Sequence, residues 1–266
     1  MFEQFLPFPD LNPIALSLGP FHIYWYAIAY VAGIILGWQY IRLYVKRRGV
    51  QNITLLNVDD MVTSSIIGIL VGGRLGYVLF YNPVHFAKNP LEIFMTWQGG
   101  MSFHGGVIGV MIGLFMLSYR KKLPFLSLTD LVAIAGLIGI YFGRLANFVN
   151  GELYGRITDV SWAVLFPTGG YLPRHPSQLY EAFLEGAALF MILAFYAWRT
   201  PAMKYPGKVT GLGLILYAAM RSFSEFFREP DTVSGLYFDS VTKGQILSLP
   251  FVMLGGYLLF RKHNAS

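Results

Sequence analysis

The sequence predicts an all-α polytopic membrane protein, in which residues 1–266 form a single integral-membrane domain with seven transmembrane helices. Three observations lead to this fold class. The 266 residues are 55% hydrophobic and only 13% charged, whereas a soluble domain carries about 25% charged residues. The apolar residues fall into seven separate segments. Basic residues follow every second segment, which is typical of a chain that crosses a membrane repeatedly.

Each apolar segment is close to the roughly 20 residues that an α-helix needs to cross about 30 Å of hydrocarbon. The helices are predicted over residues 21–42, 60–81, 103–119, 125–148, 177–198, 209–227 and 243–260. The third is short, so it is expected to begin deeper in the membrane or to tilt. Asn150-Gly151 favours a turn and is predicted to end the fourth helix. Ser177, which follows Pro176, is a candidate N-cap for the fifth.

The placement of lysine and arginine predicts the orientation. The groups after the first, third, fifth and seventh helices hold most of the 20 basic residues: Arg42, Lys46, Arg47, Arg48, Arg120, Lys121, Lys122, Arg199, Lys204, Lys208, Arg261 and Lys262. Cytoplasmic loops of membrane proteins carry such an excess. The N-terminus is therefore predicted outside and the C-terminus in the cytoplasm. The net charge of +6 is explained by this topology and calls for no nucleic acid partner.

Three longer segments are expected on the outer side, over residues 82–102, 149–176 and 228–242. They contain Pro, Gly, Asn and Asp and are predicted to be loops or small re-entrant pieces. Residues 149–176 form the longest of them and are predicted to make a small periplasmic head.

Ionisable residues from several predicted helices gather at one depth, in the outer half of the bilayer. They are Arg74, His104, Arg144, Glu181, Glu185, Arg221 and Glu225. Such residues are costly in hydrocarbon and usually face an interior cavity. Transporters commonly bind their substrates near the midplane between repeated halves. A cluster displaced to one leaflet, without a clear repeat, instead predicts a site that acts at the outer membrane surface.

The three arginines at this depth have the chemistry to bind a lipid phosphate. A guanidinium group presents paired N–H donors that match phosphate oxygens. The alternative is internal pairing, of Arg221 with Glu225 and of Arg144 with Glu152 or Glu181. Both interpretations are open from the sequence.

Two further residues could take part in chemistry at this depth. His104 lies between glycine pairs in GGMSFHGG, residues 99–106, and glycines let another chain or a ligand approach the backbone closely. Its imidazole can act as a base near neutral pH, and a purely structural histidine is the equal alternative. Asn147 lies three residues after Arg144 on the same helix face, where it can orient Arg144 or donate to a ligand.

Several kinds of chemistry are excluded by what the sequence lacks. There are no cysteines, so disulfides, thiolate metal sites and a cysteine nucleophile are ruled out. No H-E-x-x-H or other metal-binding spacing occurs, and Ser177 has no G-x-S-x-G context that would make it a nucleophile. No metal site is therefore expected from the sequence motifs.

Four long motifs are similar to those of one known family. GRLANFVNGELYGR (143–156), GGMSFHGG (99–106), LPRHPSQLYE (172–181) and YAAMRSFSEFFREPD (217–231) resemble the prolipoprotein diacylglyceryl transferase family. HIYWYAIAY near the N-terminus and GQILSLP near the C-terminus extend the resemblance over nearly the whole chain.

The resemblance implies a reaction. The diacylglyceryl group of phosphatidylglycerol moves to the lipobox cysteine thiol of a prolipoprotein, which yields a thioether and releases glycerol phosphate, as the first step of lipoprotein maturation. The implied location is the bacterial inner membrane, with the active site facing the periplasmic leaflet. The implied partners are phosphatidylglycerol and a prolipoprotein signal peptide with its lipobox cysteine. No cofactor is implied.

The same resemblance assigns functional residues. Those expected to be catalytic are His104, Arg144 and Arg221; those expected to bind substrate are Tyr26, Asn147, Glu152, Gly155 and Tyr217. Arg74 is added to the substrate-binding residues because of its predicted depth in the membrane and not because of the resemblance. His104 is the candidate base that forms the thiolate nucleophile, with Glu152 as the second candidate. The arginines are expected to stabilise the charge on the leaving phosphate. Glu225 and Arg228 lie in the same motifs without a firm role.

Two rival functions use the same features. A lipid flippase would bind the headgroup through the same arginines and would need a polar path to the cytoplasmic side. Apart from Asp130, few ionisable groups lie in the inner halves of the predicted helices. An intramembrane protease would need a Ser/His pair or two aspartates, and the inner halves contain no aspartate pair.

Overall fold

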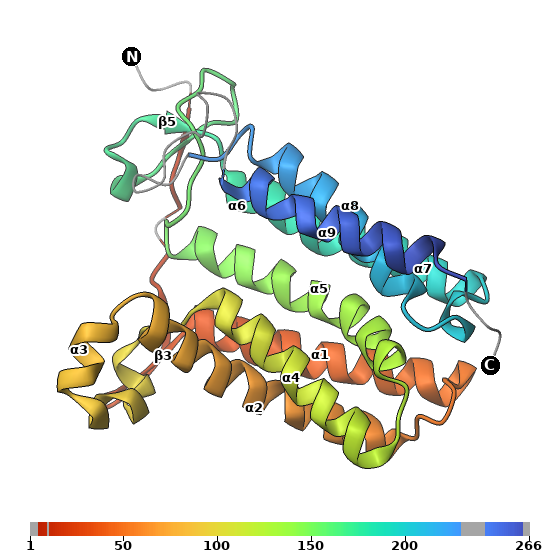
Figure 1. Cartoon of the computed structure of the whole chain (residues 1–266). Helices are drawn as coiled ribbons and strands as arrows, with labels where there is room; N and C mark the ends of the chain where they lie inside the picture. Colours follow the sequence, from red (N-terminus) through yellow and green to blue (C-terminus); the bar gives the residue numbers. More distant parts are fainter. Residues whose placement is uncertain (1–4, 10, 230–242, 263–266) are drawn as a thin grey trace. The chain divides into compact units, whose positions relative to one another are not determined.

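The computed structural model describes residues 5–9, 11–229 and 243–262 of the chain (Figure 1). Its regular structure is mostly helical, which confirms the predicted class. The chain divides into two compact units: a first unit of Met1–Tyr40 with Val132–Ser266, and a second unit of Ile41–Leu131. The long helices α1 (Trp25–Arg48) and α5 (Phe125–Val149) contribute residues to both units.

Five helices are long and apolar enough to cross a membrane. They are α1, α2 (Leu55–Phe80), α4 (Phe103–Lys121), α5 and the continuous helix Ser177–Arg199. The last two predicted spans are also helical, as α8 (Lys208–Ser224) and α9 (Lys243–Phe260), but they are shorter. The chain is therefore a multi-pass membrane protein, and a total of seven spans stays a prediction.

The prediction of helix at residues 21–24 was wrong. Phe21–Tyr24 form strand β3, which pairs antiparallel with β2 (Ile14–Leu18), and α1 begins only at Trp25. Gly19 has a φ of +60° at the turn between these strands, a conformation that glycine adopts readily. A short apolar run has no periodicity that separates a strand from the start of a helix.

In the second unit, α2 and α4 pack along a line of glycines. Gly68, Gly72 and Gly76 on α2 meet Gly105 and Gly109 on α4. A Cβ added to Gly76 would lie 2.8 Å from the Cα of Gly105, so the space admits no side chain. Small residues at four-residue spacing let membrane helices approach this closely. The chain that connects α2 to α4 forms α3 (Pro83–Lys88) and the 3-10 helices η1 (Pro90–Phe94) and η2 (Thr96–Gln98).

In the first unit, close helix contacts are also made at glycines. A Cβ on Gly33 of α1 would lie 2.8 Å from the Cα of Gly139 on α5. The helix Ser177–Arg199 consists of α6 (Ser177–Glu181), the π-helical η4 (Ala182–Ala188) and α7 (Leu189–Arg199). α8 packs against this helix and against α9 (Figure 1).

A small sheet includes residues of the segment predicted to be a head. Within residues 149–176, β4 (Val164–Leu165) and β5 (Pro173–Arg174) pair antiparallel and are connected through the 3-10 helix η3 (Pro167–Gly169). The strand β1 (Leu6–Pro7) pairs parallel with β4, so the N-terminal segment adds a strand to this sheet. Phe166 is fully buried there, with the ring of Phe8 at 5.3 Å.

The ends of the outer segments partly match expectation. α5 ends at Val149 and Gly151 has a φ of +63°, which confirms that Asn150-Gly151 ends this helix. Of the predicted outer segment 228–242, only residues 228 and 229 lie in the described part of the chain.

Candidate active site

The centre of the site is a buried pair of carboxylates on one helix of the first unit. Glu181 ends α6 and Glu185 lies in the π-helical η4, and their side chains are 1% and 0% exposed. A π-helical turn within a longer helix is rare and frequently marks a functional site. Gly186 lies so close to α5 that an added Cβ would be 2.7 Å from the Cα of Tyr141. The glycine therefore lets both carboxylates approach α5.

Arg144 on α5 pairs with both carboxylates. Its Nη1 lies 2.8 Å from Oε2 of Glu181, and its Nη2 lies 3.3 Å from Oε2 of Glu185. Of the two internal partners that the sequence left open for Arg144, Glu181 is the one observed. Among the described contacts, Arg144 makes no ion pair with Glu152.

Arg221 on α8 reaches the same two carboxylates from another helix. Its Nη1 lies 3.4 Å from an oxygen of Glu181 and 3.4 Å from an oxygen of Glu185. Its Nη2 pairs with Glu225 one helical turn later, which is the internal pair expected from the sequence. Gly244 at the start of α9 packs on this carboxylate, where an added Cβ would lie 2.5 Å from Oε1 of Glu225.

Arg228 adds a third cation, with Nη1 3.4 Å from Oε1 of Glu181. Three guanidinium groups and three carboxylates thus balance one another, as buried charges must. A guanidinium has five N–H donors. Among the described contacts, Arg144 and Arg221 use only their Nη atoms, so their Nε–H groups can donate to a ligand oxygen.

A turn after α5 holds Glu152 by amides. Asn147 Nδ2 donates to Oε1 of Glu152 at 2.8 Å, and Asn150 Nδ2 donates to the same oxygen at 3.3 Å. Gln178 Nε2 donates to the backbone carbonyl of Glu152 at 2.7 Å. The structure therefore joins the predicted residues Asn147 and Glu152 directly, and Glu152 is exposed at the surface of this turn.

Gly155 connects this turn to the arginine cluster. Its backbone N–H donates to the carbonyl of His175 at 2.9 Å, and its backbone also bridges Arg228. An added Cβ would lie 2.6 Å from the oxygen of His175, so the position admits only glycine. The prediction that Ser177 caps the next helix was wrong: Ser177 is the first helical residue, and its Oγ donates to the carbonyl of Leu153 at 3.1 Å.

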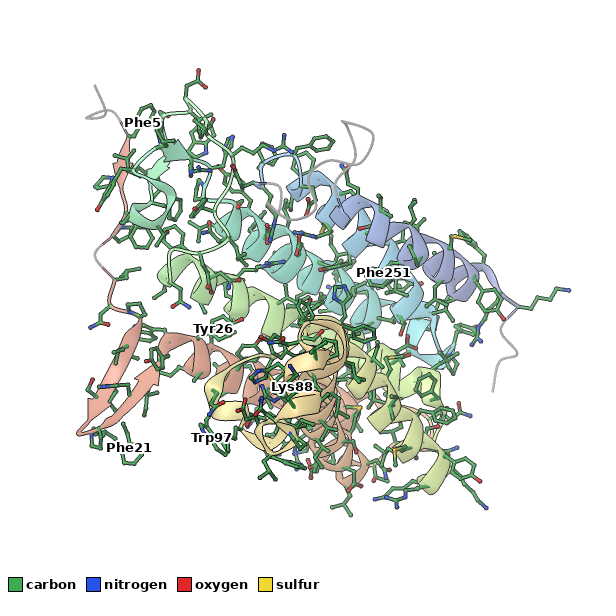
Figure 2. The ribbon with its side chains drawn as sticks, turned by 60° about the vertical axis from the view of Figure 1, so that its left-hand side comes forward. Phe5, Phe21, Tyr26, Lys88, Trp97 and Phe251 are labelled. Carbon is green, nitrogen blue, oxygen red and sulfur yellow. The ribbon has the colours of Figure 1, made fainter. Side chains whose placement is uncertain are left out.

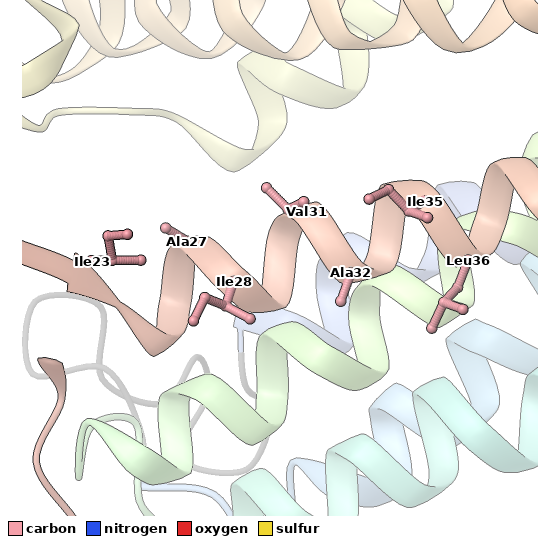
Figure 3. Close-up of a pocket in the computed structure, with 7 residues that line it drawn as sticks. All are labelled: Ile23, Ala27, Ile28, Val31, Ala32, Ile35 and Leu36. Carbon is pink, nitrogen blue, oxygen red and sulfur yellow. The ribbon is translucent and has the colours of Figure 1, made fainter. Parts of the chain in front are cut away.

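Two tyrosines predicted to bind substrate also lie in the first unit. Tyr26 is in the first turn of α1, with its Oη 3.4 Å from that of Tyr30 (Figure 2). Tyr217 lies one turn before Arg221, with its ring 6.2 Å from that of Phe251. An apolar hollow of about 510 Å³ lies along the start of α1, next to Tyr26 in the sequence. Figure 3 shows the side chains that line it, which are Ile23, Ala27, Ile28, Val31, Ala32, Ile35 and Leu36.

The remaining two predicted site residues belong to the second unit. His104 is exposed in the first turn of α4, with its ring edge-on to that of Phe103 at 5.7 Å. Arg74 is buried on α2, and its hydrogen bonds go to backbone carbonyls between Glu92 and Gly100. The N–H groups of Arg74, which were predicted to bind a lipid phosphate, thus donate to these carbonyls instead.

Sequence reasoning placed Glu181 and Glu185 at the depth of the site but did not select them as site residues. Their signal is the spacing of two acids four residues apart in an otherwise apolar segment. His175 was also passed over. Its ring lies 5.2 Å from that of Phe227, and burial lowers its pKa below the ordinary value. In the described part of the chain, no group of three His, Cys, Asp or Glu could hold a metal.

The fold and the site define a multi-pass helical membrane protein with an ion-paired arginine site among its helices. A sequence model of prolipoprotein diacylglyceryl transferase matches residues 13–261. The chain belongs to the prolipoprotein diacylglyceryl transferase family and is a transferase.

Its relatives match over nearly their whole length. A protein of Rickettsia felis named phosphatidylglycerol–prolipoprotein diacylglyceryl transferase is 50% identical over 96% of this chain and 98% of its own. Proteins of the same name are 51% identical in Rickettsia bellii, over 96% of this chain and 97% of theirs, and 50% identical in Rickettsia typhi, over 96% and 98%.

Proposed function

We propose that this protein transfers the diacylglyceryl group of phosphatidylglycerol to the lipobox cysteine thiol of a prolipoprotein. The observation that carries this proposal is the match, at about half identity and nearly full length, to proteins named for that transfer. The site is consistent with the chemistry, because the chain contains no cysteine and the substrate supplies the only thiol that the reaction needs.

In the proposed reaction one bond forms and one breaks. The cysteine sulfur attacks the glycerol carbon that is bonded to the phosphate oxygen, and the C–O bond to that oxygen breaks. The products are a thioether-linked diacylglyceryl peptide and glycerol phosphate. The thiol proton leaves to a base, since the thiolate is the nucleophile and a free thiol has a pKa of about 8.5. Atoms and charge balance without a cofactor.

Arg144 and Arg221 are proposed to stabilise the leaving phosphate. Both are fixed on helices by the same carboxylates, Glu181 and Glu185, and charged donors fixed in advance are effective where charge develops. A phosphate that enters the cluster would accept hydrogen bonds from the Nε–H groups of the arginines. It would also replace some of their contacts with the carboxylates. Asn147 and Gly155 are proposed to shape the adjoining turn through Glu152 and Arg228.

His104 is proposed as the base. It is exposed at the start of α4, so its imidazole is accessible to a substrate thiol. Glu152 is the second candidate, and the amides of Asn147 and Asn150 donate to its carboxylate.

The remaining substrate contacts are proposed on α1 and α8. Tyr26 and Tyr217 would contact the lipid, and the apolar hollow beside Tyr26 has the chemistry of an acyl-chain site. The prolipoprotein signal peptide is the second partner. We place the protein in the bacterial inner membrane, with the site open to the periplasmic leaflet.

Reconstituted protein tests the proposal against its two rivals. Purified protein in nanodiscs of phosphatidylglycerol is incubated with a lipobox peptide, and the peptide mass is measured. We expect the cysteine to gain one diacylglyceryl group, and a peptide with serine in place of the cysteine to stay unmodified. A cleaved peptide would identify a protease. An unmodified peptide with redistributed lipid would identify a flippase.

A further inference from the structure

Between α2 and α4, one side chain binds five backbone carbonyls of residues 92–100. Arg74 donates from Nε to the carbonyl of Ile93 at 2.8 Å and from Nη1 to that of Gly99 at 2.6 Å. Its other bonds go to the carbonyls of Gly100 and Met95, at 3.1 and 3.3 Å, and to that of Glu92. These contacts match the five N–H donors of a guanidinium.

We call this set of hydrogen bonds from Arg74 the clamp. Donors of this kind are needed where irregular backbone lies in hydrocarbon. Short 3-10 helices leave carbonyls at their ends without partners. In water these groups bind solvent, but in hydrocarbon each unsatisfied group costs several kcal/mol. Arg74 is buried beneath the segment, with its guanidinium carbon 5.1 Å from the centre of the Phe86 ring. Its donors reach the carbonyls from the inside. Those of Glu92 and Met95 also accept from backbone N–H groups, so the donors of Arg74 matter most for the carbonyls of Ile93, Gly99 and Gly100.

The outer edge of the same segment is apolar. Leu91, Phe94 and Trp97 are 75%, 75% and 77% exposed. They recur every three residues through η1 and η2, and side chains three residues apart align along a 3-10 helix. Between them lie Glu92, Ile93 and Met95, whose backbone carbonyls accept hydrogen bonds from Arg74. These three residues are less exposed. Figure 2 shows the side chain of Trp97 on this segment.

The ends of the segment fix it near a membrane. α2 ends at Phe80 and α4 begins at Phe103, and both helices are apolar enough to cross a bilayer. The backbone N–H of Ser102 donates to the carbonyl of Gly73 at 2.9 Å, which ties the end of the segment to α2. Phe80, Tyr81 and Phe103 are exposed at these ends, where aromatic residues form a belt at membrane surfaces.

We infer that residues 90–98 lie in the boundary between lipid headgroups and acyl chains, with Leu91, Phe94 and Trp97 in the lipid and Arg74 satisfying the backbone from within. The occupant of this apolar edge is the surrounding membrane, because the helices on both sides hold the segment at its surface. Lys88, exposed on α3, would extend its ammonium group to the headgroups. This inference stands independently of the proposed reaction.

Spin labels on single cysteines test the location, and the cysteine-free chain makes each label unique. The label is placed by Leu91→Cys, Phe94→Cys or Trp97→Cys in protein reconstituted in phosphatidylglycerol vesicles. Lys88→Cys is the aqueous reference, and Met111→Cys, exposed on α4, is the lipid reference. Collisions with lipid-soluble oxygen are compared with those of a water-soluble nickel chelate.

The measured quantity is the collision rate with oxygen divided by the collision rate with the nickel chelate, called the oxygen-to-nickel ratio. We expect this ratio at residues 91, 94 and 97 to be several-fold above that at residue 88 and to approach that at residue 111. A ratio equal to that at residue 88 would overturn the inference, as would low collision rates with both reagents, which indicate coverage by protein.

Arg74→Lys tests the clamp. A lysine has three donors on one nitrogen and cannot reach carbonyls spread over nine residues in this fork geometry. We expect the ratio at residue 97 to fall several-fold in the Arg74→Lys background, while that at residue 111 is unchanged. An unchanged ratio at residue 97 would overturn the role of Arg74. The scan with Arg74 intact decides the location even where Arg74→Lys fails to fold.

Discussion

Arg144 and Arg221 come from different helices and share the carboxylates Glu181 and Glu185. The carboxylates orient both guanidinium groups before any lipid binds, so little reorganisation is needed when negative charge develops on a leaving group. The same carboxylates compete with a phosphate for the arginine donors. At the scale of single residues, the carboxylates therefore fix the orientation of both arginines and also compete with a phosphate for their N–H donors.

Glu185→Gln tests this competition, because it removes one negative charge and keeps the shape of the side chain. We expect glycerol phosphate to inhibit transfer by the variant at about tenfold lower concentration, which corresponds to about 1.4 kcal/mol. The inhibition constant is measured in nanodiscs, with Glu92→Gln, at the exposed His85–Glu92 pair of the second unit, as the matched control. A folded Glu185→Gln variant that is inhibited less readily than the parent protein would contradict the competition.

His104→Asn tests the base. Asparagine is polar, but it cannot take up the proton of the substrate thiol. We expect His104→Asn to lower the rate by about 10² or more. His85→Asn in the same unit serves as the control. A normal rate for His104→Asn would show that another group takes the proton.

The partners of these residues could be predicted only in part. The spacing of Arg221 and Glu225 identified their pair, since residues four apart share a helix face. The choice between Glu152 and Glu181 for Arg144 was open, because it depends on how a turn and a second helix fold against α5. The π-helical segment that carries Glu185 has no pattern in the sequence that distinguishes it from an α-helix.

The glycine line between α2 and α4 decides how these elements pack. Gly105 and Gly106 follow His104, and their sequence suggested room for a ligand or another chain. In the structure, Gly105 meets Gly72 and Gly76 of α2 within the same chain. Spacing alone indicated a close approach but did not identify what approaches, because any helix with small residues at the same interval fits.

Gly109→Ala tests this packing. An added Cβ would lie 3.0 Å from the Cα of Gly72 and closer still to the carbonyl of Gly68, so α2 and α4 must separate. We expect a loss of about 1–3 kcal/mol, read as a lower thermal unfolding midpoint in detergent. Gly136→Ala on α5 is the control, since no atom lies within 4 Å of its Cβ, and it should be neutral or stabilising. Equal midpoints for the two variants would contradict the tight contact.

At the scale of whole elements, long helices were predictable and short ones were not. The bounds of α4 and α5 agree with prediction to within two residues, because long apolar segments have few alternatives in a membrane. The predicted ends of two other helices were wrong: α1 continues to Arg48 instead of residue 42, and α2 begins at Leu55 instead of residue 60, because polar residues occupy these turns. The strand at residues 21–24 and the 3-10 helices at residues 90–98 were missed. Their conformations depend on tertiary partners, such as β2 and the Arg74 side chain.

At the scale of the whole molecule, the distribution of basic residues predicts a chain with its N-terminus outside. Lys46 and Lys262 should then face the cytoplasm and Asp159 the periplasm. Single-cysteine variants at these three positions are treated with a membrane-impermeant maleimide in spheroplasts. We expect Asp159→Cys to react at once, and Lys46→Cys and Lys262→Cys to react only after permeabilisation. Reaction of Lys46→Cys in intact spheroplasts would reverse the topology.

The stoichiometry of transfer, with Arg221 varied, tests the proposed reaction and its site together. Protein in nanodiscs of phosphatidylglycerol is given a lipobox peptide, and both the diacylglyceryl-peptide and the released glycerol phosphate are quantified. We predict one glycerol phosphate for each modified peptide, and a loss of about 10²–10³ in both with Arg221→Gln, while Arg199→Gln, at the end of α7, transfers normally. Unequal yields of the two products, or normal transfer by Arg221→Gln, would contradict the proposed reaction or its site.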